Sequence, residues 1–269
     1  MEAPTLTQEI VTRIRRTVYS VLGLISKQAP IVVYCYHSIS SDNWRFSVSE
    51  EILKQQVDFL MSGAKPISME DLADYLDGQN KIHEPSFILA FDDGYQDLLS
   101  VKDYLPFLGI KPTVFVLANP ERIDRTQIST NKSFLTNEEI LSLHKAGWDI
   151  GCHGATHADL TKLSHNQLEA EIIKAKQLLE TILNIPIKYF AYPKGKYTPK
   201  IIEIVKKAGF KLAFSMDYRI ITPQSDQFSI PRVGVDHSHT FREFKGISSP
   251  ATIRMKKLGA RLLPEGIYD

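Results

Sequence analysis

Two adjacent aspartates are the first candidates for residues that bind a metal ion or act in catalysis. Asp92 and Asp93 follow the apolar run of residues 86–91 and lead into a glycine turn. Neighbouring carboxylates point in different directions, so one can bind a metal ion while the other acts as a general base. An ordinary Asp-Gly turn would look the same. Taken alone, the pair leaves both interpretations open.

Two histidines, His153 and His157, lie four positions apart. This spacing brings two imidazoles onto one face of a helical turn, where they can bind zinc together, although two unrelated surface histidines would give the same pattern. With one aspartate they would make a three-ligand site with open positions, which is typical of catalytic zinc and also of Fe(II) oxygenases. A neighbouring base favours the hydrolase, and we recognise no anchor for an oxygenase cosubstrate.

Alternating strands and helices must position these residues. From Pro30 onward, short apolar runs alternate with capped helical stretches, which predicts βα units and a mainly parallel sheet. Polar residues recur after these runs, and parallel strands end at a common edge, so one shared site is expected there. Seven units indicate a closed or nearly closed barrel, although an open doubly wound sheet gives the same alternation. The predicted strands span residues 31–36, 86–91, 112–117, 148–152, 189–192, 211–215 and 230–235.

The helix ends are also marked in the sequence. Capping residues begin each predicted helix, and a glycine follows several of them. The longest irregular segment, 119–133, is expected to be a surface loop near the site. The predicted helix starts are Ser49, Ser68 with Asp71, Ser164 with Gln167, and Thr198 before Pro199.

Three motifs in this order resemble the polysaccharide deacetylase family, carbohydrate esterase family 4, over roughly residues 30 to 245. The resemblance implies a distorted (β/α)7 barrel, a divalent metal held by Asp93, His153 and His157, and Asp92 as the general base. The motifs are Phe91-Asp92-Asp93-Gly94, His153-x-x-x-His157 and Phe190-Ala191-Tyr192-Pro193-Lys194-Gly195.

The first strand ends in Tyr36-His37, similar to a subgroup in which this histidine is the general acid. We therefore expect His37 to protonate the leaving group, with His237 near the C-terminus as the competing candidate. Arg232 is a candidate for orienting Asp92, and a surface salt bridge is the alternative interpretation of this arginine.

The third motif departs from the family pattern, which commonly has an arginine before the proline and a tyrosine after it. This chain has residues 190–192 before Pro193 and Lys194 after it. A backbone N–H survives any change of side chain, so Lys194 is expected to donate to an oxyanion. Tyr95 and Pro193 are expected to contact the substrate beside it.

The resemblance implies metal-dependent hydrolysis of N-acetyl groups from amino sugars of a glycan or a glycan precursor. The expected partner is an N-acetylated glycan or a lipid-linked sugar. Zn²⁺ is the expected metal, with Co²⁺, Ni²⁺, Mn²⁺ and Fe²⁺ as alternatives. Three other functions remain open. One is removal of a different acyl group, formyl or O-acetyl, from a sugar or lipid-linked sugar. The second is a catalytically silent glycan-binding module, and the third is the Fe(II) oxygenase.

The amino-acid composition bears on which partners the protein binds and in which compartment it works. The 32 basic and 31 acidic residues leave a net charge of +1, so no overall field recruits nucleic acid. Cys35 and Cys152 sit in apolar runs and are expected to be buried and free, which favours a reducing compartment. Without a convincing signal peptide, a cytoplasmic location is expected. Residues 1–29 are predicted to form an amphipathic helix. Its apolar face is expected to pack on the protein's own core or on a partner subunit, and contact with a membrane surface is the alternative. Residues 246–269 are predicted to form a basic tail, and the oligomeric state stays open.

Overall fold

The computed structural model describes residues 17–19, 21, 29–83 and 85–262 of the chain. Most of the predicted N-terminal helix, residues 1–29, lies outside these described residues. Its membrane contact and the cytoplasmic location therefore stay predictions. Among the described helices, none combines the length and the apolar character that crossing a membrane requires.

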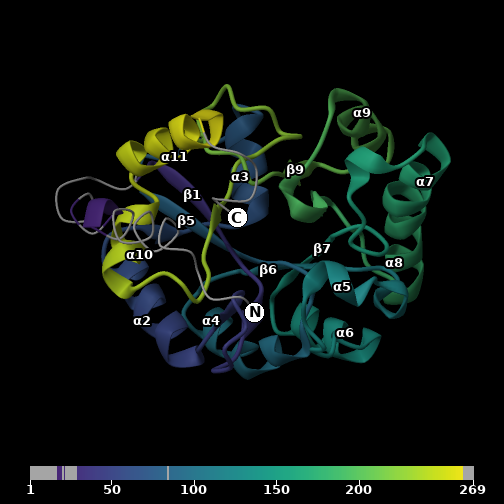
Figure 1. The fold of residues 1–269 in the computed structure, drawn as a ribbon, viewed down its shortest axis with the longest axis horizontal. Helices are drawn as coiled ribbons and strands as arrows, with labels where there is room; N and C mark the ends of the chain where they lie inside the picture. The colour runs from purple at the N-terminus through teal and green to yellow at the C-terminus, as the bar shows by residue number, and fades with distance from the viewer. Residues whose placement is uncertain (1–16, 20, 22–28, 84, 263–269) are drawn as a thin grey trace.

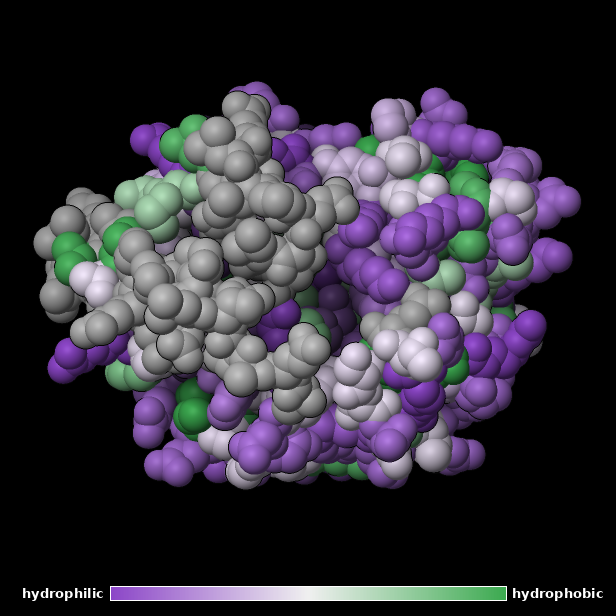
Figure 2. Space-filling model, viewed as in Figure 1, coloured by the Kyte–Doolittle hydropathy of each residue, from purple (hydrophilic) through white to green (hydrophobic). Residues whose placement is uncertain are grey.

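A curled sheet forms the centre of the molecule, and helices surround it (Figure 1). Its strands are β1 (Ile31–Tyr36), β4 (Lys65–Pro66), β5 (Ser86–Phe91), β6 (Thr113–Val116), β7 (Asp149–Cys152), β8 (Tyr189–Ala191), β9 (Leu212–Phe214) and β10 (Val233–Gly234). They lie in the order β10-β1-β5-β6-β7-β8-β9, β4 pairs with the start of β5, and every pairing is parallel. The face in Figure 1 is hollowed near its centre, and hydrophilic side chains gather beside the hollow (Figure 2).

The segment from Ile230 to Val235 joins the two ends of the sheet. The Ile230 N–H donates to the Ala213 carbonyl in β9, and the Val235 N–H donates to the Cys35 carbonyl in β1, each at 2.9 Å. This segment closes the sheet, and the predicted distorted (β/α)7 barrel is confirmed. Arg232 lies in the middle of the closing segment.

Burial explains why the long strands could be predicted. Every residue of β1 and β5 is buried, as expected for parallel strands that are covered on both faces. Three two-residue strands were not predicted, because so short a pairing leaves no pattern of alternation. They are β4 and the separate parallel pair β2 (Ser38–Ile39) and β3 (Ser47–Val48).

The predicted helix starts are present. Ser68 with Asp71 and Ser164 with Gln167 form capping boxes, and Ser49 accepts from the backbone of the first turn of α2. The helices are α2 (Glu50–Met61), α3 (Met69–Leu76), α4 (Tyr104–Phe107), α5 (Arg125–Ile128), α6 (Asn137–Lys145), α7 (His165–Glu169), α8 (Ala175–Leu183), α9 (Pro199–Lys207), α10 (Phe241–Ile247) and α11 (Pro250–Leu262), and a π-helical segment, Ala170–Lys174, joins α7 to α8.

Two stretches differ from expectation. Segment 119–133 contains a 3-10 turn (Pro120–Arg122) and α5, because Pro120 and the Asp124 cap each start a short helix. The predicted boundary after residue 245 falls inside α10, and Phe244, Ile247 and Ile253 are buried in the core. The folded unit therefore continues through these C-terminal helices.

Candidate active site

Two neighbouring regions of the sheet deliver a buried carboxylate and two imidazoles to one point. Asp93 follows β5, and His153 follows β7 directly. Asp93 Oδ1 lies 3.5 Å from Nε2 of His153 and 3.5 Å from Nε2 of His157. All three side chains are buried, so the sequence motifs that lie 60 residues apart meet as one cluster.

This cluster fits a divalent metal ion. Asp93 Oδ1 is buried and has no hydrogen-bond partner among the described residues. Buried acceptors normally have a partner, and a metal ion bound to this oxygen would supply one. His153 Nδ1 lies 2.8 Å from the Ala191 carbonyl, which fixes the proton on that nitrogen and turns the Nε2 lone pair toward Asp93. One carboxylate and two neutral imidazoles form a donor set typical of catalytic zinc and of related divalent metals.

Burial lowers the pKa of His153 from 6.5 to about 4. In the unfolded chain this imidazole takes up a proton near pH 6.5, so the unfolded state binds more protons between pH 6.5 and 4. We therefore expect the free energy of unfolding of the metal-free protein to fall over that window, by roughly 3 kcal/mol. Urea denaturation at several pH values measures it.

A His153→Gln variant provides the control for this pH dependence. It has no titrating side chain at this position, so its free energy of unfolding should change less between pH 6.5 and 4. Asp92 does not interfere with this comparison. Its pKa lies below its ordinary 3.8 in the folded protein, so its contribution to the free energy of unfolding is lost below the range from pH 6.5 to 4. Equal slopes for the two proteins would exclude His153 as the source.

The predicted helical turn between the two histidines is wrong. Residues 153–157 form a loop without helical hydrogen bonds. Gly154 has φ of 83° and His157 has φ of 60°, so the chain turns back on itself and brings the second imidazole to the first. Asp93 and Lys194 are also left-handed, with φ of 69° and 59°. Non-glycine residues held in this region often mark functional sites, because the surrounding structure must stabilise the strain.

Glu171 holds the loop that carries both histidines, and it was not predicted from the sequence. Its Oε2 accepts from the backbone N–H groups of Ala155 and Thr156, each at 3.0 Å, and its Oε1 accepts from the Thr156 hydroxyl at 2.7 Å. Glu171 is buried and lies in the π-helical segment, a local irregularity that often occurs at functional sites. The only available signal was a glutamate inside an amphipathic helix, which is common on helix surfaces.

Glu171→Gln is expected to weaken metal binding about 10- to 100-fold. The glutamine amide has one acceptor oxygen where the carboxylate has two, and it carries no charge, so the loop would lose the charge-assisted part of its anchor. Competition with a chromogenic chelator measures the dissociation constant, and the absorption spectrum of bound Co²⁺ reports the coordination geometry. Glu169→Gln, on the neighbouring helix surface, is the matched control. Equal metal affinity in both variants would show that Glu171 does not position the ligands.

Asp92 is held by a buried arginine from the closing segment. The Arg232 guanidinium donates two parallel hydrogen bonds, from Nη1 to Oδ1 at 2.7 Å and from Nη2 to Oδ2 at 2.8 Å. The Arg232 side chain is 0% exposed, so the contact is no surface salt bridge. Burial alone would raise the pKa of Asp92, but the guanidinium outweighs it and holds this pKa well below its ordinary value. Asp92 is therefore an ionised, fixed carboxylate.

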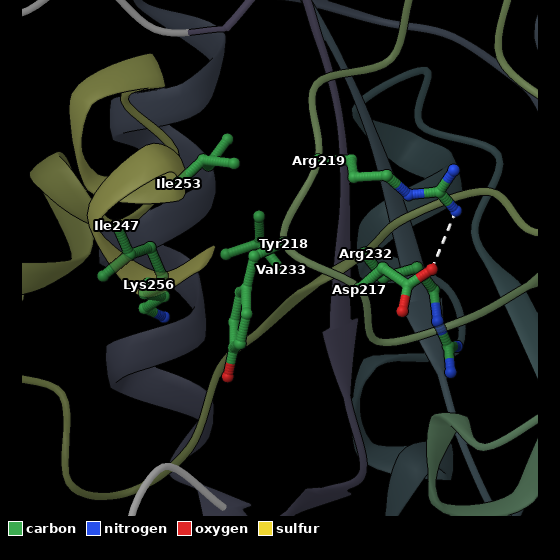
Figure 3. Close-up of a pocket in the computed structure, with 8 residues that line it drawn as sticks. All are labelled: Asp217, Tyr218, Arg219, Arg232, Val233, Ile247, Ile253 and Lys256. Atoms are coloured by element: carbon green, nitrogen blue, oxygen red, sulfur yellow. Dashed lines mark hydrogen bonds and ion pairs between the residues drawn. The ribbon is translucent and has the colours of Figure 1, made fainter. Parts of the chain in front are cut away.

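Arg232 also lines a small pocket between α10, α11 and residues 217–219 (Figure 3). Apolar side chains from the two helices line one side, and an ion pair between Arg219 and Asp217, at 2.8 Å, lines the other. None of the metal-ligand candidates lines it. We therefore place the chemistry in the cluster around Asp92 and Asp93 rather than here.

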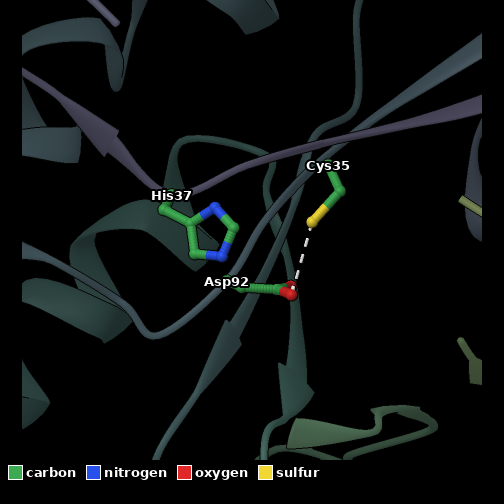
Figure 4. Close-up of side chains that lie close together, drawn as sticks. All are labelled: Cys35, His37 and Asp92. Carbon is green, nitrogen blue, oxygen red and sulfur yellow. Dashed lines mark hydrogen bonds between the residues drawn. The ribbon is translucent and has the colours of Figure 1, made fainter. Parts of the chain in front are cut away.

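His37 lies beside Asp92, together with Cys35 (Figure 4). One side-chain atom from each of the three residues lies within 4.8 Å of the others. The Cys35 thiol donates to Asp92 Oδ2 at 3.3 Å, and both cysteines are free and buried, as expected from the sequence. His237 belongs to neither cluster of potential ligands in the described part of the chain, and its backbone N–H donates to the Arg45 carbonyl. The geometry thus favours His37 over His237 as the acid.

Two of the three predicted substrate contacts, Tyr95 and Pro193, lie beside the same cluster. Tyr95 is fully buried, and burial together with the neighbouring Asp93 carboxylate raises its pKa. Pro193 lies next to the histidine loop, where a side chain on Gly154 would approach its ring to 3.5 Å. Lys194 is exposed and follows Pro193 in a 3-10 turn.

A parallel barrel with a metal-binding cluster and a fixed carboxylate at its strand ends belongs to the class of metal-dependent hydrolases. Residues 79–213, half of the chain, match the family described as polysaccharide deacetylase, and the chain belongs to that family. The predicted family, barrel and hydrolytic deacetylase are thereby confirmed. The finer Tyr-His subgroup and the role of each site residue stay predictions.

Relatives and solved structures agree with this assignment. A Staphylococcus aureus (strain MRSA252) protein named poly-beta-1,6-N-acetyl-D-glucosamine N-deacetylase is 26% identical over 211 residues, which cover 74% of this chain and 71% of the relative. The structure of IcaB from Ammonifex degensii superimposes with a TM-score of 0.71 at 23% identity, covering 85% of this chain and 98% of IcaB. The Streptococcus pyogenes deacetylase PplD, solved with acetate, gives 0.66 at 20% identity and covers 89% and 100%.

Proposed function

We propose that this protein removes N-acetyl groups from amino sugars of a glycan or lipid-linked sugar and releases acetate. The observation that carries this proposal is the buried cluster of Asp93, His153 and His157 next to Asp92, a carboxylate kept ionised by Arg232. The family and the relative named as an N-deacetylase of a poly-N-acetylglucosamine support the choice of substrate.

Asp93, His153 and His157 would hold the metal, for which we propose Zn²⁺. A divalent ion there supplies a Lewis acid that polarises the acetamide carbonyl and lowers the pKa of the attacking water. Asp92 accepts the proton of that water as the water oxygen bonds to the carbonyl carbon. Arg232 keeps the Asp92 carboxylate ionised and fixes its orientation, so that it can accept this proton.

Two further groups complete the reaction. The backbone N–H of Lys194 donates to the carbonyl oxygen as negative charge develops on it, a contribution of the kind that is typically about 3 to 4 kcal/mol. His37 gives a proton to the nitrogen as the carbon–nitrogen bond breaks. Water and acetamide are thus converted to acetate and a free amino sugar, and His37 and Asp92 must exchange a proton with solvent before the next turnover.

The acyl group is the part of the proposal that needs a direct test. We would incubate the metal-loaded protein with N-acetylated, N-formylated and O-acetylated glucosamine oligomers and identify the acid released. Acetate from the N-acetylated oligomer is the expected product. Formate alone, or acetate from the ester alone, would replace the proposed reaction with deacylation of a different group. If neither acetate nor formate is released from any of these substrates, the proposed hydrolysis is contradicted and a role in glycan binding is the remaining function.

A further inference from the structure

An arc of aromatic rings lies against the proposed acid and the metal ligands. The Phe46 ring lies 4.8 Å from the His37 ring, and Trp44 contacts Phe46 at 5.3 Å and Tyr95 at 5.2 Å between ring centroids. Tyr95 in turn stacks on Phe134 at 5.2 Å. The arc therefore runs from His37 through Tyr95, which lies two positions after Asp93, to Phe134.

Part of this arc is open to solvent next to the site. Trp44, Phe46 and Phe134 are half-buried, whereas Tyr95 is fully buried beneath them. Phe46 and Tyr95 meet the indole of Trp44 at interplanar angles of 67° and 76°. Both contacts are T-shaped, so neither ring stacks on the indole, and Trp44 keeps part of its surface in contact with solvent.

Charged contacts fix the segment that carries Trp44. Its backbone N–H donates to Asp42 at 3.0 Å, and Asp42 pairs with Lys132. Lys132 also pairs with Asp97, which accepts from the Ser38 hydroxyl at 2.6 Å. This network links the segment of Trp44 to Ser38, the residue after His37, before any ligand binds. Such preorganisation lowers the entropic cost of binding.

We propose that Trp44 binds the pyranose ring of the sugar next to the one that is deacetylated, so that the substrate is an oligosaccharide rather than a single amino sugar. The inference rests on the proposed function for the class of ligand. The C–H face of a hexosamine carries partial positive charge and is attracted to the negative face of an aromatic ring. Trp44 contacts Phe46, and Phe46 contacts His37. A sugar bound to Trp44 would therefore lie next to the sugar whose nitrogen His37 protonates.

The two tryptophans of the chain allow a direct binding test. Trp148 is 1% exposed in the core, so a fluorescence change on adding a glycan reports Trp44. We would mix metal-loaded protein with β-1,4- and β-1,6-linked N-acetylglucosamine pentamers and record fluorescence within milliseconds, before turnover. We expect a saturable change with at least one pentamer, and none in Trp44→Phe at the same concentrations.

Kinetics provide a second readout. Trp44→Ala should raise KM for that pentamer roughly tenfold and leave hydrolysis of p-nitrophenyl acetate unchanged, because the ester has no second sugar. Trp44→Tyr should restore most of the affinity. Phe107→Ala, which removes an aromatic side chain that is 87% exposed, is the matched control and should not change KM.

The outcomes separate this inference from the proposed function. A fluorescence change without acetate release would support Trp44 as a sugar contact and contradict deacetylation. Acetate release with unchanged fluorescence and with the same KM in Trp44→Ala would support deacetylation and overturn the role of Trp44. An equal loss of p-nitrophenyl acetate hydrolysis in Trp44→Ala would show a structural role instead, and a response to neither pentamer without acetate release would overturn both.

Discussion

Asp92→Asn is expected to lower kcat for acetate release by roughly 10²- to 10⁴-fold while the protein still binds metal. The amide keeps the shape of the carboxylate but cannot accept the proton of the attacking water. Asp93, His153 and His157 are unchanged, so the metal content should stay at the wild-type level. Acetate release and elemental analysis of the same preparation measure the two quantities.

The control for this variant is Asp149→Asn. Asp149 lies at the start of β7, at the opposite end of the strand from His153, and forms an ion pair with Lys111 at 2.8 Å. Its loss should change kcat by less than about threefold, because this ion pair lies at the end of β7 that is away from the cluster. An Asp92→Asn protein that keeps wild-type kcat would exclude Asp92 as the base.

Arg232→Ala is expected to affect both stability and activity. The arginine is fully buried against Asp92, and removing one partner of a buried pair typically costs about 3 to 5 kcal/mol. The pKa of Asp92 should rise without the guanidinium, so the acidic limb of the kcat/KM profile should move to higher pH. Arg232→Lys should recover little, because an ammonium cannot pair with both carboxylate oxygens.

A double variant separates the two effects of Arg232. Asp92→Leu with Arg232→Met replaces the buried pair with apolar side chains, so much of the lost stability should return in guanidinium denaturation while acetate release stays absent. Arg219→Ala, which removes a half-buried arginine paired with Asp217, should leave the acidic limb unchanged. An unshifted acidic limb in Arg232→Ala would contradict the assignment of Arg232 as the group that sets the pKa of Asp92.

Local signals in the sequence were enough to predict the elements that position the site. The runs 31–36 and 86–91 are buried along their whole length, so their apolar composition predicted the strands correctly. The capping boxes at Ser68 and Ser164 mark helix starts through hydrogen bonds within a few residues. Strand ends share one edge of a parallel sheet, which predicted a common site there. The family resemblance implied Asp93, His153 and His157 as its metal ligands.

Long-range contacts could not be predicted in the same way. The pairing of Arg232 with Asp92 joins residues 140 positions apart, and the sequence alone left a surface salt bridge open. Glu171 acts through a π-helical segment, and no local pattern distinguishes that segment from an ordinary helix. The His153-x-x-x-His157 spacing was interpreted as a helical turn, but a glycine and a left-handed histidine bring the two rings together equally well.

The most direct test of the central claim is a metal titration of chelator-stripped protein, with bound metal and acetate release from an N-acetylglucosamine pentamer measured in the same samples. We predict no acetate from the stripped protein, a rate that rises with bound Zn²⁺ up to about one ion per chain at the Asp93, His153 and His157 cluster, and no recovery in His157→Ala. Full acetate release from metal-free protein, or wild-type rates in His157→Ala, would contradict a reaction centred on this cluster.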